Sequence, residues 1–459
     1  MRTHCHFFFL FGMFLLSAVL HAQVELGEAE NPASDLWSDP SFRKSFSGSY
    51  GFLAEKEPDI SNDEADVLRE LLDLIPADTD AAIERLEQVI DPDSSAAFDF
   101  ILGNLYFEAD AAGKAEASYK RAIDKHPEFR RAHKNLGLLH VREGNYKDAV
   151  RALSQAMELG EVNGRAYGLL GYSYLALGDY YPAAAAYRQA ILMQPDTEDW
   201  KAGLARALVE SDQPREAISL LDSLLKEYPD NGNYWLLQTN AFIAADRPLM
   251  AAENLEIIRR MGGADVRALT LLGDIYMNNT SPGLALNAYL EAADQADDSD
   301  AQALLRATDL LIRSGNHERA GELLARIKQR LGDPPERADE MKQLTLEARI
   351  ARAAGDDERA RSLLKEIVER DALNGEALIE LGKLYAEQGE MTRAVNRFEQ
   401  AEKIEGFERK ALIAHARALV KDGALEDALP LLRRALKLES DEALQQYMER
   451  VERAAEDRN

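Results

Sequence analysis

The sequence is poor in cysteine and in positive charge. Its single cysteine, Cys5, precedes the first apolar run, so we expect neither disulfide bonds nor thiol chemistry in the mature protein. Aspartate and glutamate number 81, against 54 lysines and arginines, which gives a formal net charge of -27. Such a chain would repel the phosphates of nucleic acid, so we predict no nucleic-acid partner. It could attract a basic protein.

The sequence also lacks the short motifs of common enzyme classes. No G-x-S-x-G, Walker loop, dinucleotide-binding glycine fingerprint or H-E-x-x-H occurs in it. Nothing in it alternates strand and helix patterns, as an α/β enzyme would. We therefore predict an all-α protein that is not an enzyme and has no metal site and no cofactor. A hydrolase with an unrecognised site is the less favoured alternative.

Long apolar runs are missing, except at the N-terminus. Residues 7–20 are apolar or small, and Leu20-His21-Ala22 offers a cleavage site, which is the pattern of a secretory signal peptide. The run is too short and too early for a membrane span. We predict an exported, periplasmic protein, assuming a Gram-negative bacterium, with no direct membrane insertion of the mature chain.

A repeat of 34 residues runs through the middle of the chain. One position of this repeat holds small residues and one threonine: Gly103, Gly137, Gly171, Ala205, Thr239 and Gly273. Another position holds alanine alone: Ala115, Ala149, Ala183, Ala217, Ala251 and Ala285. Six copies without an insertion cannot arise by chance, so the chain is predicted to consist of repeated structural units.

This pattern resembles the tetratricopeptide repeat, whose signature is W-x2-L-G-x2-Y, then A-x3-F, then P. The resemblance implies an α-solenoid, a right-handed superhelix of antiparallel helix pairs. Small residues would let the two helices of a pair approach closely, and tyrosines such as Tyr187 would fill the space between successive pairs. Prolines such as Pro214 and Pro248 would open second helices, where a missing N–H costs nothing.

The repeat pattern divides the chain into segments. Ten repeats are expected between Ala96 and Glu442, after one degenerate copy. The segments are a signal peptide (1–22), a polar segment containing aromatic residues (23–61), the degenerate repeat (62–95), six repeats in strict register (96–299), a seventh repeat with a proline-rich loop (300–340), three further repeats (341–442), and a capping helix with a tail (443–459).

In the resembled family, the first helices of the repeats line a concave groove that holds extended peptides or a partner's helix. Carrying the family's groove positions over gives the candidate partner-binding residues Asn104, Phe107, Arg131, Lys134, Asn135, Arg165, Tyr172, Arg206, Leu236, Asn240, Arg267 and Asp274. Some family members clamp a terminal carboxylate. Here Phe100 and Leu169 replace two of the required basic residues, so we do not expect such a clamp.

Two interpretations of these residues stay open. Any one of them could be an ordinary solvated side chain, whereas the groove as a whole is better explained by binding. The segment 23–61 is too polar and too short to fold alone. Its aromatic residues either dock on the first repeats or form a motif for a partner.

Two runs, beginning YGLLGYSYLALGDYY and YWLLQTNAFIAADRP, are similar to exported bacterial repeat proteins counted among the components of TonB energy-transduction systems, beside ExbB, ExbD and TonB. The similarity implies a periplasmic scaffold for a protein or peptide partner, which could be basic and rich in lysine and proline. A scaffold for envelope or exopolysaccharide assembly is the alternative. The sequence does not fix the oligomeric state.

Overall fold

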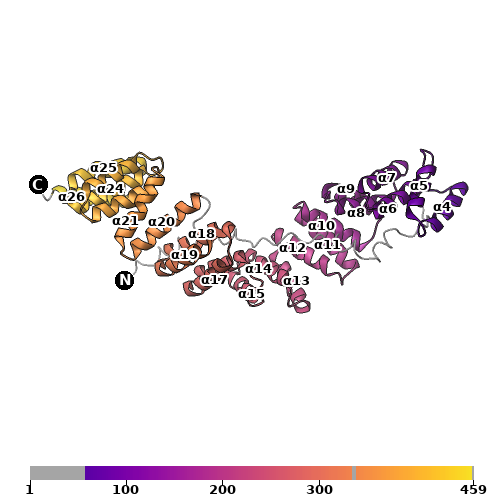
Figure 1. Ribbon diagram of the computed structural model, residues 1–459, viewed down its shortest axis with the longest axis horizontal. Coiled ribbons are helices and arrows are strands. Elements are labelled where there is room, and N and C mark those ends of the chain that lie inside the picture. The colour runs from indigo at the N-terminus through magenta and orange to yellow at the C-terminus, as the bar shows by residue number, and fades with distance from the viewer. Residues whose placement is uncertain (1–56, 333–336, 457–459) are drawn as a thin grey trace. The chain divides into compact units, whose positions relative to one another are not determined.

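The structure is a computed structural model that describes residues 57–332 and 337–456. Within these residues it contains 23 α-helices and one 3-10 turn and no strand, which confirms the all-α prediction. The helices pair in chain order (Figure 1). The predicted signal peptide, the aromatic residues of the segment 23–56 and the proline-rich loop at 333–336 lie outside the described residues.

The described chain forms two compact units, which meet in sequence after Gly263. The helices of the first unit are α4 (Asn62–Leu74), α5 (Thr79–Val89), α6 (Ala96–Glu108), α7 (Ala112–Lys125), α8 (Arg130–Arg142), α9 (Tyr146–Glu158), α10 (Gly164–Ala176), α11 (Tyr180–Met193), α12 (Glu198–Glu210), α13 (Pro214–Glu227), α14 (Gly232–Ala244) and α15 (Pro248–Arg260).

The second unit continues the same alternation of first and second helices. Its helices are α16 (Val266–Asn278), α17 (Pro282–Gln295), the 3-10 turn η1 (Asp298–Asp300), α18 (Ala301–Arg313), α19 (His317–Leu331), α20 (Arg337–Ala353), α21 (Asp357–Arg370), α22 (Gly375–Glu387), α23 (Met391–Glu402), α24 (Glu408–Asp422), α25 (Leu425–Leu438) and α26 (Glu442–Glu456). The pairs from α6/α7 to α24/α25 number ten.

In five of the described helix pairs, a glycine of the first helix lies against a large side chain of the second. A methyl group added to Gly103 would lie 2.6 Å from Cε1 of Tyr119, and one added to Gly273 would lie 2.2 Å from Cε1 of Tyr289. Both rings are fully buried. These rings pack inside a helix pair, whereas the sequence placed them between successive pairs. Tyr187 does both, because it meets Gly171 of its own pair and Gly203 of the next.

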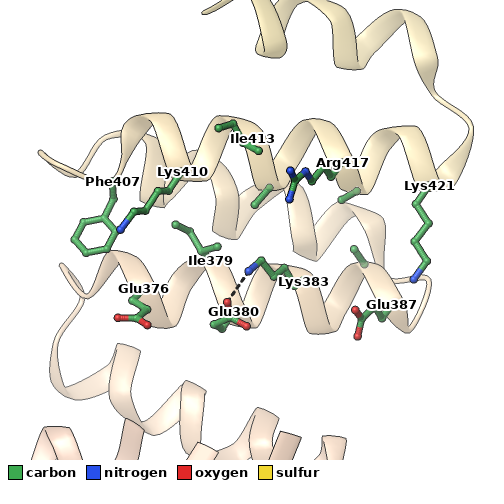
Figure 2. Close-up of a pocket in the computed structure, with 13 residues that line it drawn as sticks. Glu376, Ile379, Glu380, Lys383, Glu387, Phe407, Lys410, Ile413, Arg417 and Lys421 are labelled. Carbon is green, nitrogen blue, oxygen red and sulfur yellow. Dashed lines mark hydrogen bonds and ion pairs between the residues drawn. The ribbon is translucent and has the colours of Figure 1, made fainter. Parts of the chain in front are cut away.

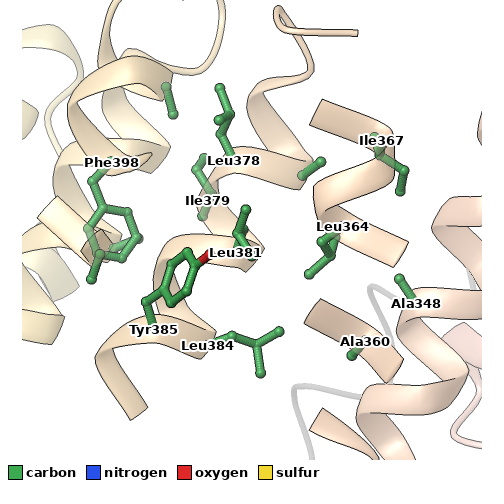
Figure 3. Packing of buried hydrophobic residues seen from close by; sticks show 14 of the residues in the cluster. Ala348, Ala360, Leu364, Ile367, Leu378, Ile379, Leu381, Leu384, Tyr385 and Phe398 are labelled. Carbon is green, nitrogen blue, oxygen red and sulfur yellow. The ribbon is translucent and has the colours of Figure 1, made fainter. Parts of the chain in front are cut away.

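The same contact organises the core of the second unit (Figure 3). The ring of Phe398 on α23 lies against Gly382 on α22, where an added methyl would come within 2.6 Å of it. Leucine side chains of α22, with Leu364 and Ile367 of α21, fill the space between successive pairs. The core is thus a continuous row of contacts between neighbouring repeats, as expected for a solenoid.

Turns and caps follow from local residue chemistry. Most turns from a first to a second helix contain a residue with positive φ, such as Gly178, which has no Cβ to clash. Pro214, Pro248 and Pro282 occupy the first position of α13, α15 and α17, as predicted. Helix α26 buries only Leu444, Val451 and Ala455, and so closes the core with a mostly polar outer face.

An ionic cluster of Glu402, His415 and Arg434 joins the last two helix pairs. Glu402, at the end of α23, lies 3.0 Å from Nδ1 of His415 and 3.1 Å from Nη1 of Arg434. The ring of His415 also stacks on Phe398. Burial alone would raise the pKa of Glu402, but its hydrogen bond to His415 and the charges of His415 and Arg434 outweigh it and lower the pKa overall.

We predict that changing Gly273 to alanine will destabilise α16 and α17 by about 1–3 kcal/mol, because the new methyl group would displace the ring of Tyr289. Hydrogen exchange of the amides in these two helices would measure the effect. Gly283→Ala, in the same repeat, is the matched control. A methyl group there meets nothing within 4 Å. Equal effects of the two substitutions would refute the packing argument.

We predict that Glu402 stabilises the fold above the unfolded-state pKa, whose reference value is 4.5, and that this contribution is lost as the pH falls through the lower folded-state pKa. Glu402→Gln should therefore lower the melting temperature near neutral pH by more than it does in acid. Thermal melts at several pH values between about 3 and 7 test this. Glu399→Gln, at an exposed position of the same helix, is the control, and a difference from wild type that is the same at every pH would contradict the prediction.

Candidate protein-binding grooves

The structure buries the predicted groove residues Asn104 and Asn135, and this corrects their expected place on an open face. The hydroxyl of Tyr119 donates to Oδ1 of Asn104 at 2.8 Å, and Nδ2 of Asn135 donates to the same oxygen at 2.9 Å. Asn104 and Asn135 are 0% and 1% exposed. They therefore tie the first two repeats together, and neither is accessible to a partner.

Three further predicted residues are also buried. Phe107 packs under the guanidinium of Arg142, which lies 4.1 Å from the ring centre, and Tyr172 meets Tyr146 edge to face. Asn240 is 3% exposed. These side chains lie on first helices, as predicted, and are packed within the protein.

The predicted cations of α8 have carboxylate partners within the chain. Arg131 lies 2.7 Å from Glu57 and over the rings of Phe100 and Phe129. Lys134 lies 3.8 Å from Glu161. Burial lowers the pKa of Lys134, against the opposing charge of Glu161. Both cations therefore have a carboxylate partner, although Glu161 also contacts Arg130 at 3.4 Å.

The remaining predicted residues are spread along the chain. Arg165 and Arg206 are half-buried, and so is Leu236. Arg267, in the second unit, is exposed and lies 3.7 Å from Asp265. Asp274 accepts a hydrogen bond from the hydroxyl of Tyr289 at 2.7 Å and pairs with Arg306 at 2.7 Å.

The last residues of the predicted N-terminal segment dock on the first repeats. Besides the contact between Glu57 and Arg131, Pro58 is buried, and the hydroxyl of Ser95 donates to the carbonyl oxygen of Asp59 at 2.8 Å. Residues 57–60 therefore pack against the first repeats. The aromatic residues on which the two interpretations depended lie outside the described residues.

A hollow of about 560 Å³ lies between α22 and α24 in the second unit (Figure 2). We call it the C-terminal groove. It is lined by Glu376, Ile379, Glu380, Lys383, Ala386 and Glu387 on one side, and by Phe407, Lys410, Ile413, Ala414, Arg417, Ala418 and Lys421 on the other.

The two walls of the C-terminal groove differ in charge. The acids of α22 all have partners: Glu376 lies 2.5 Å from Arg349, Glu387 lies 2.5 Å from Arg352, and Glu380 lies 2.6 Å from Lys383. On α24, by contrast, three exposed cations pair with no carboxylate of the described part of the chain. They are Lys410, Arg417 and Lys421.

Our sequence-based selection missed this groove because it ended at the sixth strict repeat. The 34-residue spacing in the sequence contains the signal, because residues 34 apart face each other across the groove. Ile379 faces Ile413, and Glu387 faces Lys421 (Figure 2). Continuing the same positions into the last two repeats would have found Ile379, Lys410, Ile413 and Arg417, but not Glu387 or Lys421, which occupy a position that was not selected.

A second hollow, of about 280 Å³, lies between α20 and α22. Half of its lining residues are aliphatic, Ile312, Leu364 and Ile367 among them, and it shares Glu376 and Glu380 with the C-terminal groove. Among residues 57–332 and 337–456, no group of three or more histidine, cysteine or acidic side chains could hold a metal ion, and no helix is both long and apolar enough to cross a membrane. Charge and apolar contact are thus the means of recognition that these hollows offer.

Comparison with known families decides the class of the protein. The sequence model of the tetratricopeptide repeat matches residues 77–128, 112–167, 134–202, 270–334 and 345–407, and a second model of this repeat matches residues 174–241. Together these matches cover more than half of the chain. The chain belongs to the tetratricopeptide repeat family. Members of this family bind proteins and peptides, so this tetratricopeptide repeat array is a protein-interaction scaffold.

Individual relatives match only in part. The array is similar to Superkiller complex protein 3 of Mus musculus, with 24% identity over 205 residues, 43% of this chain and 13% of that protein. It is also similar to Cellulose synthase 2 operon protein C of Komagataeibacter xylinus, with 26% identity over 322 residues, 61% of this chain and 23% of that protein. The chain thus spans less than a quarter of the length of either relative.

Among solved structures, the array is similar to YrrB, described as a TPR protein with an unusual peptide-binding site. The TM-score is 0.38 and the identity 19%, over 42% of this chain and 96% of that one.

We predict that Glu57 and Arg131 are energetically coupled by about 1.5–3 kcal/mol, because both side chains are largely shielded from water and their contact is charge-assisted. A double-mutant cycle of Glu57→Gln and Arg131→Gln, followed by hydrogen exchange of the amides of α8, measures this coupling. The exposed pair of Asp148 and Arg151, 3.0 Å apart, serves as control. Coupling no larger than in that pair would show that residues 57–60 are not anchored there.

Proposed function

We propose that this chain is an exported, non-catalytic scaffold that holds an extended segment of a partner protein in the C-terminal groove. The observation that carries the proposal is the groove itself, a hollow between two neighbouring first helices. It has an apolar floor, and three of its cations have no carboxylate partner among the described residues. The predicted residues of the first repeats are a weaker candidate, because their side chains are buried or already paired.

The length of the groove suits a short linear segment. Lys410 and Lys421 lie eleven residues apart on α24, which corresponds to roughly 16 Å along the helix axis. An extended chain covers this distance in about five residues. Ile379, Ile413 and the alanines between them offer apolar contact to such a segment, and the charged walls can fix its register.

Export is supported by the sequence of the first 22 residues, where the apolar run is followed by Leu20-His21-Ala22. We propose that cleavage after Ala22 releases a periplasmic protein. The intact mass of the protein purified from the native envelope is the direct check. A mature chain that begins at Gln23 is expected, and retention of residues 1–22 would contradict export by this route.

We propose a TonB energy-transduction system as the first context, on the strength of the two similar runs in the third to sixth repeats. The net charge of -27 would attract a basic, lysine- and proline-rich partner at long range. The acids of the C-terminal groove are already paired, so in this context the groove would hold a segment of another component of the system.

Envelope polysaccharide assembly is the second candidate context, and a specific observation favours it. The similarity to Cellulose synthase 2 operon protein C extends over 61% of this chain, and that protein is named for an operon that makes a polysaccharide. In that context the groove would hold a segment of a synthase or of an outer-membrane subunit.

Site-directed photo-crosslinking in the native envelope tests the function. A photoreactive phenylalanine analogue at Ile413, on the groove floor, should capture a distinct partner, whereas the same group at Leu192, which is 76% exposed in the first unit, should not. Mass spectrometry then separates TonB-system proteins from polysaccharide-assembly proteins. The same captured proteins at both positions, or none at Ile413, would refute binding in this groove.

A further inference from the structure

The cations of α24 stand out because none of them pairs with a carboxylate of the described fold. Most arginines around the groove are tied to acids: Arg349 contacts Asp309 and Glu376, and Arg352 contacts Asp357 and Glu387. Lys410 and Arg417 approach only aromatic rings, those of Phe407 and Tyr447, at 5.7 and 5.9 Å. In a chain with 27 more acids than bases, three such cations in one hollow need an explanation.

All three cations lie on the groove side of α24 (Figure 2). Opposite them, the acids of α22 are neutralised by Arg349, Arg352 and Lys383. A segment entering the groove therefore meets uncompensated positive charge on one wall and compensated charge on the other. Charge complementarity selects an anionic segment.

The spacing of the cations restricts the conformation of that segment. Lys410, Arg417 and Lys421 are seven and then four residues apart, which places them roughly 10 and 6 Å apart along the helix axis. In a polyproline II segment, every third side chain lies on the same face, about 9 Å from the previous one. Carboxylates at every third residue thus reach all three cations with a mismatch of about 2 Å, which flexible side chains absorb.

A β-strand fits less well, because residues three apart on a strand point to opposite faces. The floor of the groove also suits polyproline II. Phe407 and Ile413 offer flat apolar contact to proline rings, and aromatic-lined grooves recognise such segments in other proteins. A polyproline II segment is already ordered before binding, so little conformational entropy is lost.

We infer that the C-terminal groove binds acidic polyproline II segments with a carboxylate at every third residue, contacted in turn by Lys410, Arg417 and Lys421. This inference rests on the proposed function and deepens it by naming the partner's chemistry. It gives the groove a partner of opposite charge to the lysine-rich segment considered for the TonB context.

Fluorescence anisotropy with labelled synthetic peptides and the mature chain, residues 23–459, tests the inference. The probe Glu-Pro-Ser-Glu-Pro-Ser-Glu should bind about tenfold or more tightly than a peptide of the same composition with its three glutamates adjacent, and more tightly still than the lysine counterpart Lys-Pro-Ser-Lys-Pro-Ser-Lys. Its affinity should fall as salt is raised from about 50 to 300 mM.

A charge-neutral triple variant tests the residues. K410Q/R417Q/K421Q should bind the glutamate probe about tenfold more weakly than the wild type. The matched control is K365Q/K403Q/K437Q, which removes the same charge from exposed positions of the same unit, outside the groove lining. It should change the affinity less than about twofold. Circular dichroism and melting temperature establish that both variants are folded.

Each contrary result overturns the inference in a distinct way. An equal loss of affinity in the two triple variants would show a general charge effect. Equal binding of the peptide with adjacent glutamates would show that the carboxylate spacing does not matter. Tighter binding of the lysine peptide would show that the partner is basic and not acidic. Dissociation of a dimer on K410Q/R417Q/K421Q substitution, seen by sedimentation, would assign the groove to a second copy of the chain. The photo-crosslinking experiment at Ile413 does not depend on any of these results, so it tests the proposed function separately.

Discussion

The close approach of two helices, a small residue against an aromatic ring, is the contact on which the rest of this structure depends. At Gly273 the ring of Tyr289 fills the space that a side-chain methyl group would take, and the hydroxyl of Tyr289 donates a hydrogen bond to Asp274. In the same way, the ring of Tyr119 lies against Gly103 and its hydroxyl donates a hydrogen bond to Asn104. The core contact therefore also determines how polar groups of the first helix are held.

The packing of successive pairs places their first helices side by side and determines which side chains lie opposite each other. Because the repeat length is 34 residues, a side chain in one repeat lies opposite its counterpart 34 positions later, as Ile379 and Ile413 do (Figure 2). The charge of a groove is then fixed by two neighbouring repeats and not by the whole chain. A protein with a net charge of -27 can consequently carry a row of cations that pair with no carboxylate in the described part of the chain.

The sequence predicts the fold well because the repeat pattern states the packing directly. The small residue at Gly273 and the ring at Tyr289 are both visible in it. The sequence predicts the site poorly, because a polar side chain at a groove position can either face solvent or form a hydrogen bond with a tyrosine of the second helix. The residue type alone does not decide between the two. Asn104, for example, is buried and accepts a hydrogen bond from Tyr119. The pairing of Glu57 with Arg131 joins residues 74 apart, outside any repeat spacing, so no periodic argument could find it.

The two cationic clusters differ in what they cost the fold. Arg131 and Lys134 are partly shielded from water, so their charges require Glu57 and Glu161 to be stable there. Arg417 and Lys421, by contrast, are like charges four residues apart on one helix, an arrangement that destabilises a helix by about 0.2–0.5 kcal/mol. Neither contacts a described carboxylate that would offset this repulsion. A small repulsion that no described carboxylate offsets is expected on a surface that binds an anionic partner, because the bound segment would supply the missing negative charge.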